Sequence, residues 1–351
     1  MKLRFLTSTP LDVRRGSGTF VGMRVLARTL EALGHSVAWE TPRVHLPVYT
    51  LERLLFNRLL RTSAEFDLTV GFDLDGYRIA AGGSHVAALK GVIADELRFE
   101  SGLTRATMKI QAMRERRHVQ LAHRVLTTSR YSARRAQELY GLHKTPAVVP
   151  ELIDLESWQH TLRENPAASE RFTVLFVGRF YRRKRIDVLL DAAALLRGRI
   201  PNLEIRIVGN GPCAARLRAR SRGLRLHDTV TWAGDVSHRD LAQEYNRADV
   251  FCLPSEQEGF GIVLLEAMAA AKPIVAARAA AIPETAPYAE LVEPGNAAEL
   301  AAAIESLYAS PERRAAQAGA GPRWVQQFDA PRVARLFLET VTRTGATCTS
   351  T

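Results

Sequence analysis

Cysteine is scarce in this 351-residue chain, and long apolar runs are absent. The three cysteines, Cys213, Cys252 and Cys348, are widely spaced and match no zinc-binding or disulfide pattern, which favours a reducing cytoplasm. No apolar run approaches the roughly 18 residues that a membrane-spanning helix needs, and residues 1–12 lack a signal-peptide core. We therefore expect a cytoplasmic protein that is soluble, or at most peripheral to the inner face of a membrane.

Acidic residues are also in short supply. Forty-eight Lys and Arg stand against 37 Asp and Glu, which gives a net charge of +11 and favours anionic partners. The basic residues are spread along the chain without a helix-turn-helix, zinc finger or aromatic RNA-binding motif, so we expect no nucleic-acid partner. The basic stretch 104–124 fits a weak peripheral membrane contact, an ordinary amphipathic helix, or a rim that receives a charged acceptor.

The hydrophobic pattern alternates short buried strands with amphipathic helices, which predicts an α/β fold with parallel sheets. A first series of strands is expected at 3–7, 35–39, 68–72, 91–94, 124–128 and 147–149, with a helix at 19–33. A second series is expected at 173–177, 204–208, 230–233, 250–253 and 274–276, with helices at 187–196, 212–222, 239–248 and 261–271. This organisation predicts two doubly wound Rossmann-like domains, residues 1–152 and 153–327, and a C-terminal helical segment 328–351 that returns to the first domain.

The most informative segment is a glycine-bearing loop, 254–261, between a predicted strand and a predicted helix. Free N–H groups at such a helix start bind anions, and Gly259 and Gly261 allow a phosphate close to the backbone. Glu258 lies at the mouth of this loop. Glu266 lies inside an otherwise apolar helix, where a carboxylate needs partners.

A second strand-to-helix loop, 178–185, begins with Gly178 and Arg179 and contains five basic residues. Two cations at this edge of a parallel sheet would neutralise a diphosphate and stabilise it as a leaving group. We assign that role to Arg179 and Lys184 and interpret Arg182, Arg183 and Arg185 as solvated loop residues. A third strand ends in the glycines 209 and 211, and Gly209 would line the same ligand site.

These segments together resemble the large family of retaining nucleotide-sugar glycosyltransferases with the GT-B fold, the group 1 family with a Glu-x7-Glu motif. Glu258 and Glu266 show that spacing within the Pro-Ser-x-x-Glu-Gly-Phe-Gly setting, and Gly178, Arg179 and Lys184 match the diphosphate motif. The resemblance covers most of the chain and is strongest over 172–295. It implies two domains that face each other across a cleft.

The resemblance also implies roles for individual residues. Arg179 and Lys184 would hold the donor diphosphate, Glu258 would face the transferred sugar, and Glu266 would bind ribose hydroxyls. Catalysis is therefore assigned to Glu258, Arg179 and Lys184. Donor binding is assigned to these positions of the loops and of the predicted helix 261–271: Gly16, Gly18, Gly178, Gly209, Gly259, Phe260, Gly261 and Glu266.

Some positions depart from the family pattern. The Gly-Gly that often precedes Pro-Glu is Ala280-Ala281 here, which restricts the backbone. A histidine often ends the strand before the acceptor loop, but Asp95 and Glu96 stand there and are candidates for its contact with the sugar. Asp73 and Asp75 form an Asp-x-Asp sequence after a strand. We interpret them as loop acids at the rim of the site, on the acceptor side, because the basic loops can neutralise a diphosphate without a metal ion.

The expected function is transfer of a sugar from a UDP-, GDP-, ADP- or dTDP-sugar to an acceptor hydroxyl, with retention and without metal or cofactor. The pathway would be polysaccharide, glycolipid or secondary-metabolite biosynthesis, and the protein would be a monomer or homodimer. One alternative is a weak or inactive accessory protein of the same fold. Another is an NAD-dependent Rossmann enzyme, suggested by the glycines 16, 18 and 22 and by Glu40 as a ribose-binding acid.

Overall fold

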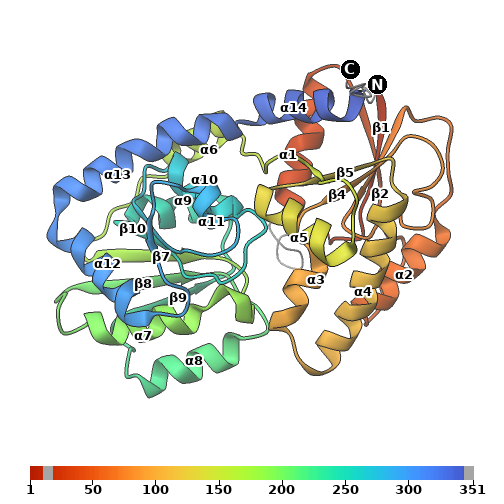
Figure 1. The fold of residues 1–351 in the computed structure, drawn as a ribbon. Helices are drawn as coiled ribbons and strands as arrows, with labels where there is room; N and C mark the ends of the chain where they lie inside the picture. Colours follow the sequence, from red (N-terminus) through yellow and green to blue (C-terminus); the bar gives the residue numbers. More distant parts are fainter. Residues whose placement is uncertain (11–18, 344–351) are drawn as a thin grey trace, which may run out of the picture. The chain divides into compact units, whose positions relative to one another are not determined.

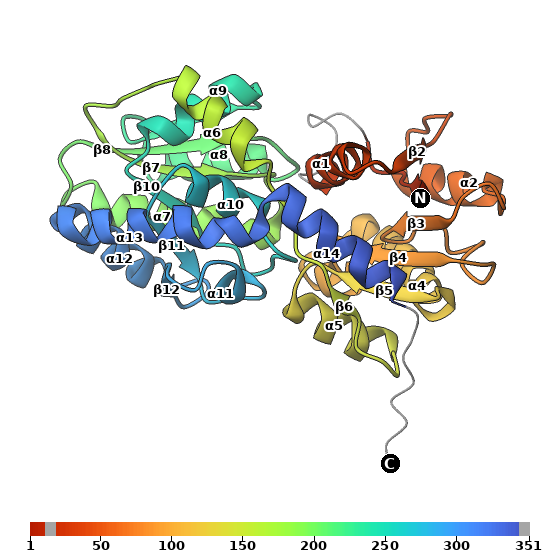
Figure 2. The ribbon, with the colours of Figure 1, turned by 90° about the horizontal axis from the view of Figure 1, so that it is seen from above.

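The computed structural model describes residues 1–10 and 19–343, and the chain forms two compact units. Unit 1 contains residues 1–152 together with the C-terminal segment that starts at Ala330, and unit 2 contains Ile153–Asp329. Figures 1 and 2 show that each unit is a sheet with helices on both faces. The α/β fold class predicted from the sequence is confirmed.

Unit 1 is built on a parallel sheet of six strands in the order β2-β1-β3-β4-β5-β6. The strands are β1 (Lys2–Leu6), β2 (Ser36–Glu40), β3 (Leu68–Phe72), β4 (His85–Leu89), β5 (Arg124–Thr127) and β6 (Ala147–Val148). The helices are α1 (Thr19–Ala32), α2 (Tyr49–Leu59), α3 (Ile93–Glu96), the 3-10 turn η1 (Leu97–Phe99), α4 (Gly102–Leu121), α5 (Arg130–Tyr140) and α14 (Ala330–Thr342). The helix α14 contacts α1 and places Val333 and Phe337 in the core of this unit.

The fourth strand of unit 1 corrects the sequence prediction. Residues 91–94 were expected to form it, but the strand is β4, His85–Leu89, and Ile93 begins the short helix α3. All five residues of β4 are buried. The sequence pattern was misleading because histidine and two alanines have weak strand propensity, whereas Val92 and Ile93 are β-branched.

Unit 2 contains a second parallel sheet, in the order β12-β11-β10-β7-β8-β9. The strands are β7 (Phe172–Val177), β8 (Leu203–Val208), β9 (Val230–Gly234), β10 (Val250–Leu253), β11 (Ile274–Ala277) and β12 (Glu290–Val292), of which β12 was not predicted. The helices are α6 (Leu155–Glu164), η2 (Arg182–Lys184), α7 (Ile186–Leu196), α8 (Ala214–Gly223), α9 (His238–Arg247), α10 (Ile262–Ala269), α11 (Ile282–Thr285), α12 (Ala297–Ala309), α13 (Pro311–Trp324) and η3 (Val325–Phe328). Strands β7, β10 and β11 are buried along their whole length, as expected for a sheet covered on both faces.

Local sequence signals explain several helix ends. Five helices begin at a residue whose side-chain oxygen accepts a backbone N–H of the first turn, which satisfies a donor that the helix itself leaves open. These N-cap residues are Ser129 (α5), Asp154 (α6), Ser237 (α9), Asn296 (α12) and Ser310 (α13). Gly141 ends α5 in the left-handed conformation that glycine adopts easily.

The strand order reverses once in each sheet, and this positions the candidate sites. In unit 1 the reversal lies between β1 and β3, and in unit 2 it lies between β7 and β10. Open α/β sheets bind ligands beyond the carboxyl ends of the two strands that flank such a reversal. Ligand binding is therefore expected at the loops after β1 and β3 and at those after β7 and β10.

Candidate functional site

The two loops that the sequence singled out meet at the strand reversal of unit 2. Loop 178–185 follows β7 and loop 254–261 follows β10, and these strands pair directly, with Phe251 opposite Leu175. The backbone N–H of Glu256 donates to the carbonyl of Arg183 at 2.8 Å, so the loops are joined beyond the sheet as well. Residues more than 70 positions apart in the sequence therefore form one site.

Lys184 and Glu258 form an ion pair at the centre of this site. The Lys184 Nζ lies 2.5 Å from Glu258 Oε1, and the two side chains are only 14% and 7% exposed. An ammonium group has three hydrogens, so its bond to Glu258 leaves donors for a further anion. Arg179 lies half-buried at the end of the same strand, β7. The arrangement places cationic groups at the edge of the sheet where the sequence predicts a diphosphate.

The other basic residues of the loop do not behave as predicted. Arg183 and Arg185 were interpreted as solvated, but Arg183 Nε donates to Gln257 Oε1 at 2.9 Å, and Arg185 pairs with Glu256. Both side chains therefore fix loop 254–261 on either side of the Lys184–Glu258 pair. No local sequence signal indicates this role, because the partners lie on a loop that is distant in the chain. Arg182 is exposed, as predicted.

Glu266 lies one turn inside α10, the helix that follows the second loop. The hydroxyl of Tyr245 donates to its Oε2 at 2.9 Å, and its backbone carbonyl accepts the Trp158 indole N–H at 3.2 Å. Burial raises the pKa of the Glu266 carboxyl from 4.5 to about 7, although the bond from Tyr245 opposes the change. The ionisation of a carboxyl group with this pKa changes near neutral pH, and so does its capacity to accept hydrogen bonds from ligand hydroxyls.

Glycines allow the loops to approach one another closely. Strands β7 and β8 pair as far as Val177 and Val208, so Gly178 and Gly209 follow side by side. Gly209 has φ 115°, and a Cβ at this position would lie 2.2 Å from the carbonyl oxygen of Gly178. Gly209 is therefore required for the packing of the two loops, whether or not it also contacts a ligand. Gly261 begins α10 in the left-handed region, with φ 93°.

Phe260 and the Ala280-Ala281 pair show how the second loop is supported. The Phe260 ring packs edge-on against Phe328 at 5.3 Å and belongs to the core, which leaves only its backbone for ligand contact. Ala280 has φ 52°, so this alanine adopts a left-handed conformation that glycine reaches more easily. Its neighbour Ala281 donates its N–H to the carbonyl of Glu258 at 3.3 Å.

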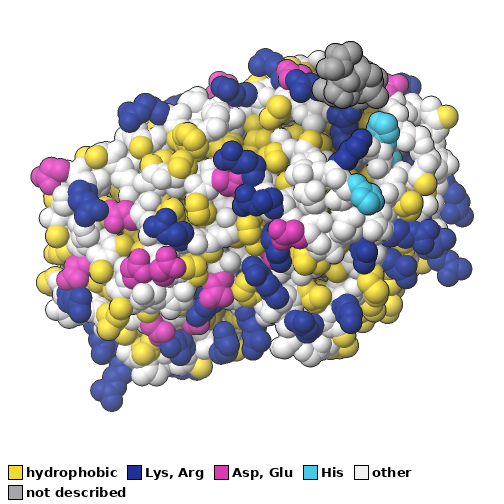
Figure 3. Space-filling view, in the orientation of Figure 1, with side chains coloured by type: hydrophobic (Ala, Val, Ile, Leu, Met, Phe, Trp, Pro, Cys, Tyr) yellow, Lys and Arg dark blue, Asp and Glu magenta, His cyan; other side chains and the backbone are white. Residues whose placement is uncertain are grey.

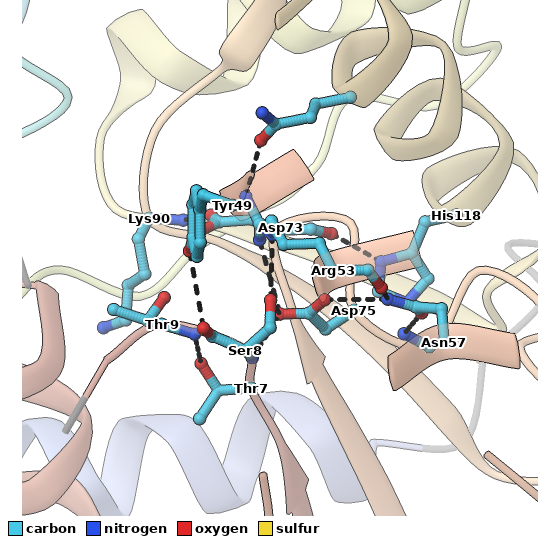
Figure 4. Close-up of polar contacts among 12 residues, drawn as sticks. Thr7, Ser8, Thr9, Tyr49, Arg53, Asn57, Asp73, Asp75, Lys90 and His118 are labelled. Atoms are coloured by element: carbon cyan, nitrogen blue, oxygen red, sulfur yellow. Dashed lines mark hydrogen bonds and ion pairs between the residues drawn. The ribbon is translucent and has the colours of Figure 1, made fainter. Parts of the chain in front are cut away.

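Asp75 lies at the strand reversal of unit 1 but not at an exposed rim. It is fully buried, and its Oδ2 accepts the Ser8 N–H at 2.6 Å and the Ser8 hydroxyl at 2.7 Å. Arg53 Nη2 at 3.3 Å and Asn57 Nδ2 at 2.9 Å complete its contacts (Figure 4). The prediction that Asp75 touches an acceptor is therefore wrong, because its carboxylate oxygens bond to Ser8 after β1 and to Arg53 and Asn57 of α2.

Asp73 keeps a surface toward solvent. Its side chain is half-buried and accepts the backbone N–H of Lys90 at 2.9 Å, and its φ is 54°. Burial raises the pKa of Asp73 from 3.8 to about 6, which the positive charge of Arg53 partly offsets. The backbone carbonyl of Asp73 contacts His118 Nδ1 at 2.5 Å. Asp73 remains the candidate of this pair for a ligand contact.

The two acids that were expected to replace a histidine differ from each other. Asp95 is 1% exposed and accepts the Tyr131 hydroxyl at 2.7 Å and Arg135 Nε at 3.0 Å. It therefore fastens α3 to α5, and the predicted sugar contact of Asp95 is wrong. Glu96 is half-buried, and its Oε1 lies close to Gly91, where a Cβ would approach it to 2.8 Å. Its assignment to the acceptor side stays a prediction.

Several important residues were not predicted. Arg53 and Asn57 are four positions apart on α2 and so share its inner face, a spacing that a helix prediction at 49–59 would have revealed. His85 and His118 are buried together, with their Nε2 atoms 2.8 Å apart. Burial lowers the pKa of His85 to about 3 and that of His118 to about 4, so the pair is uncharged at neutral pH. Both histidines are therefore neutral, buried hydrogen-bonding groups.

Three expectations concern other parts of the chain. Gly16 and Gly18 lie outside the described residues. Glu40, which the dehydrogenase alternative assigned to a ribose, pairs instead with Arg4, whose Nε lies 2.7 Å from Glu40 Oε2. Among residues 1–10 and 19–343, no three His, Cys, Asp or Glu side chains form a group that could hold a metal ion. Metal independence stays a prediction.

Comparison with known proteins relates part of the chain to a known family. Residues 159–324 match the family model "Glycosyl transferases group 1". A GDP-mannose-dependent alpha-(1-6)-phosphatidylinositol monomannoside mannosyltransferase of Mycobacterium tuberculosis is 30% identical over 217 residues, which are 57% of this chain and 56% of the relative. A D-inositol 3-phosphate glycosyltransferase of Pseudarthrobacter chlorophenolicus is 31% identical over 238 residues, 64% of this chain and 57% of the relative. The matches thus span little more than half the length of these relatives.

Solved structures extend the likeness to the whole fold. Sucrose-phosphate synthase from Thermosynechococcus elongatus superposes with a TM-score of 0.80 at 21% identity, over 97% of this chain and 98% of that protein. Anabaena Alr3699/HepE, solved in complex with UDP and glucose, gives 0.76 at 20% identity, over 98% and 100%. The fold is GT-B, as predicted. Within unit 2, residues 159–324 are thus similar to the group 1 glycosyl transferases.

Proposed function

We propose that the protein transfers a sugar from a nucleoside diphosphate donor, bound in unit 2, to the hydroxyl of an acceptor. The observation that carries the proposal is the Lys184–Glu258 pair at the strand reversal of unit 2. It joins a cation and a carboxylate beside the first turn of α10, whose backbone N–H groups favour an anion. The match of residues 159–324 to the model "Glycosyl transferases group 1" supports the same assignment.

The chemistry follows from the charges of the site. As the bond between the sugar and the diphosphate weakens, negative charge grows on the β-phosphate. Arg179, Lys184 and the N–H groups at the start of α10 would stabilise that charge, by about 3–4 kcal/mol for each well-placed donor. Because these groups are held by the protein before the donor binds, little reorganisation is needed during the reaction.

Each glutamate would then have a separate task. Glu258, held by Lys184, would accept hydrogen bonds from hydroxyls of the transferred sugar, and Glu266 would accept them from the ribose. The β-phosphate oxygen would take the proton of the attacking acceptor hydroxyl on the same face of the sugar, so the anomeric configuration is retained. No covalent bond to Glu258 is needed in this sequence of events, and no metal ion takes part.

The donor class is a nucleotide sugar, and its base and sugar are open to test. The Mycobacterium tuberculosis relative is GDP-mannose-dependent, and Anabaena Alr3699/HepE, which has the same fold, was solved with UDP-glucose. Both donors therefore belong in the first panel, with ADP- and dTDP-sugars as further members. We assign acceptor binding to unit 1, where half-buried Asp73 and Glu96 face the carboxyl ends of β3 and β4.

The test has two stages. Thermal shifts with the donor panel identify the nucleotide, and incubation with that donor and a set of hydroxyl acceptors, followed by NMR of the product, reports transfer and the anomeric configuration. Lys184→Ala should lower transfer at least a hundredfold, the loss expected for one stabilising donor of ~3 kcal/mol, whereas the exposed Arg182→Ala should keep it within a few-fold. Specific nucleotide binding without transfer to any acceptor would favour an accessory protein of this fold. Absence of both would overturn the proposal.

A further inference from the structure

Helix α2 buries several polar side chains and exposes two leucines, although Phe56 is buried as usual. Its polar side chains Glu52, Arg53 and Asn57 are buried, whereas Leu51 and Leu59 are 54% and 62% exposed. Val44 and Val48, in the segment before the helix, are also about half exposed. Surface helices normally bury the apolar face and leave the charged face to water. The inward polar residues have internal partners: Arg53 and Asn57 bond to Asp75, and Glu52 accepts the backbone N–H of Leu46. The outward leucines need a separate explanation.

Helix α4 lies beside α2 and continues this surface. Gln111 of α4 bonds to both Thr50 and Arg53 of α2. The outer side of α4 exposes large apolar residues at helical spacing: Leu103, Ile110, Met113 and Leu121. Of the fourteen large hydrophobic side chains exposed in the described part of the chain, nine belong to α4, α2 or the segment 44–48.

The charges of this surface have one sign. Arg105, Lys109, Arg116 and Arg117 are exposed on α4, and Arg58 is exposed on α2. The single acid of each helix, Glu52 in α2 and Glu115 in α4, is buried. In Figure 3 the region of α2 and α4 shows hydrophobic and basic side chains beside one another, without a visible acid.

We propose that this α2–α4 face is a docking surface for the anionic surface of a lipid bilayer. Apolar side chains that alternate with arginine and lysine suit the boundary between acyl chains and anionic headgroups. A bilayer explains the outward leucines and the missing acids together, whereas a soluble anion would explain only the charges. The contact is peripheral, since no helix within the described residues is long and apolar enough to cross a membrane. The proposal is independent of the sugar-transfer assignment, because it concerns other residues and a different measurement.

Vesicle co-sedimentation tests the proposal directly. The full chain is mixed with vesicles of phosphatidylcholine alone or of phosphatidylcholine with phosphatidylglycerol, at low and high salt. We expect binding to the anionic vesicles that weakens as salt rises. Lys109→Glu with Arg116→Glu should weaken it by roughly 25-fold or more, since each basic residue near an anionic surface contributes about fivefold. Leu51→Ser with Leu59→Ser should weaken it by about tenfold or more through lost apolar insertion.

Matched substitutions on unit 2 provide the control. Leu195 and Arg222 are exposed there, and Leu195→Ser with Arg222→Glu should leave vesicle binding unchanged. Circular dichroism and nucleotide thermal shifts show whether each variant is folded. Equal binding to both kinds of vesicle, no binding, or equal binding by wild type and α2–α4 variants would overturn the proposal. So would sedimentation velocity showing a dimer that only the leucine variants dissociate, which would make this face a self-association surface.

Discussion

Replacing Glu266 by glutamine tests the most unusual ionisable group of the site. Its carboxyl accepts the Tyr245 hydroxyl within the otherwise apolar helix α10, and burial raises its pKa from 4.5 to about 7. Glutamine keeps the shape and still accepts the Tyr245 hydroxyl, but it cannot ionise. Comparing the two proteins therefore isolates the cost of placing a charge at this position.

The direction of the effect follows from the two pKa values. Below pH 4.5 the carboxyl is protonated in both the folded and the unfolded chain, so stability does not depend on it. Between pH 4.5 and 7 the unfolded chain loses the proton first, and the folded protein becomes less stable as pH rises. A rise from 4.5 to about 7 corresponds to at most about 3 kcal/mol. Because Glu266 retains partial solvent contact, we expect about 1–2 kcal/mol.

Urea unfolding at a series of pH values measures this difference, with tryptophan fluorescence as the signal. Trp158, Trp232 and Trp324 lie in unit 2, and Trp39 lies in unit 1. Glu266→Gln should be more stable than wild type at pH 8, and its advantage should disappear near pH 4. A stability difference that is constant across this range would refute the reasoning, because it would show that the carboxyl does not titrate with a raised pKa. Tyr245→Phe, which removes the hydrogen bond to the carboxylate, should enlarge the advantage at pH 8.

The same substitution tests whether Glu266 binds the nucleotide or serves only the structure of α10. Ribose hydroxyls donate to a carboxylate, so nucleotide binding should favour the ionised form of Glu266. Affinity for the nucleoside diphosphate should then rise with pH through about 7 more steeply in wild type than in Glu266→Gln, in which only other groups such as the terminal phosphate titrate. Calorimetry in buffers of different ionisation enthalpy would detect the released proton. Identical pH profiles would assign Glu266 to the structure of α10 alone.

Three further predictions follow from the contacts of the two sites. Asp75→Ala should lower the unfolding free energy by about 3–5 kcal/mol, because it leaves the buried guanidinium of Arg53 without its carboxylate; an unchanged urea midpoint would contradict this. Glu258→Gln should nearly abolish transfer while nucleotide affinity, measured by calorimetry, stays within a few-fold; wild-type turnover would remove this residue from the sugar site. Arg183→Ala should reduce transfer by loosening loop 254–261, whereas Arg182→Ala should not; equal rates would show that the Gln257 contact is dispensable.

The two loops of the candidate site in unit 2 show which features can be predicted from local sequence. Glycine, charge and apolar periodicity marked both loops, 178–185 and 254–261, as strand-to-helix turns with ligand chemistry. The same reasoning failed for β4, whose alanines and histidine carry little strand propensity. It also failed for Arg183 and Arg185, because a basic residue beside a glycine-rich loop has the same local pattern whether it is solvated or paired.

The sequence by itself determined the fold class, the resemblance to the group 1 glycosyl transferases, and the position of Glu258, Glu266 and Lys184 within their motifs, since each depends on residues close together in the chain. Only the tertiary structure decided which residues those groups meet. Strand order brings loop 178–185 against loop 254–261, and it buries Asp75 against Ser8 and α2. Pairing across a sheet joins residues separated by tens of positions, and burial then sets the cost of each charge. A short window of sequence contains neither the strand pairing nor the degree of burial.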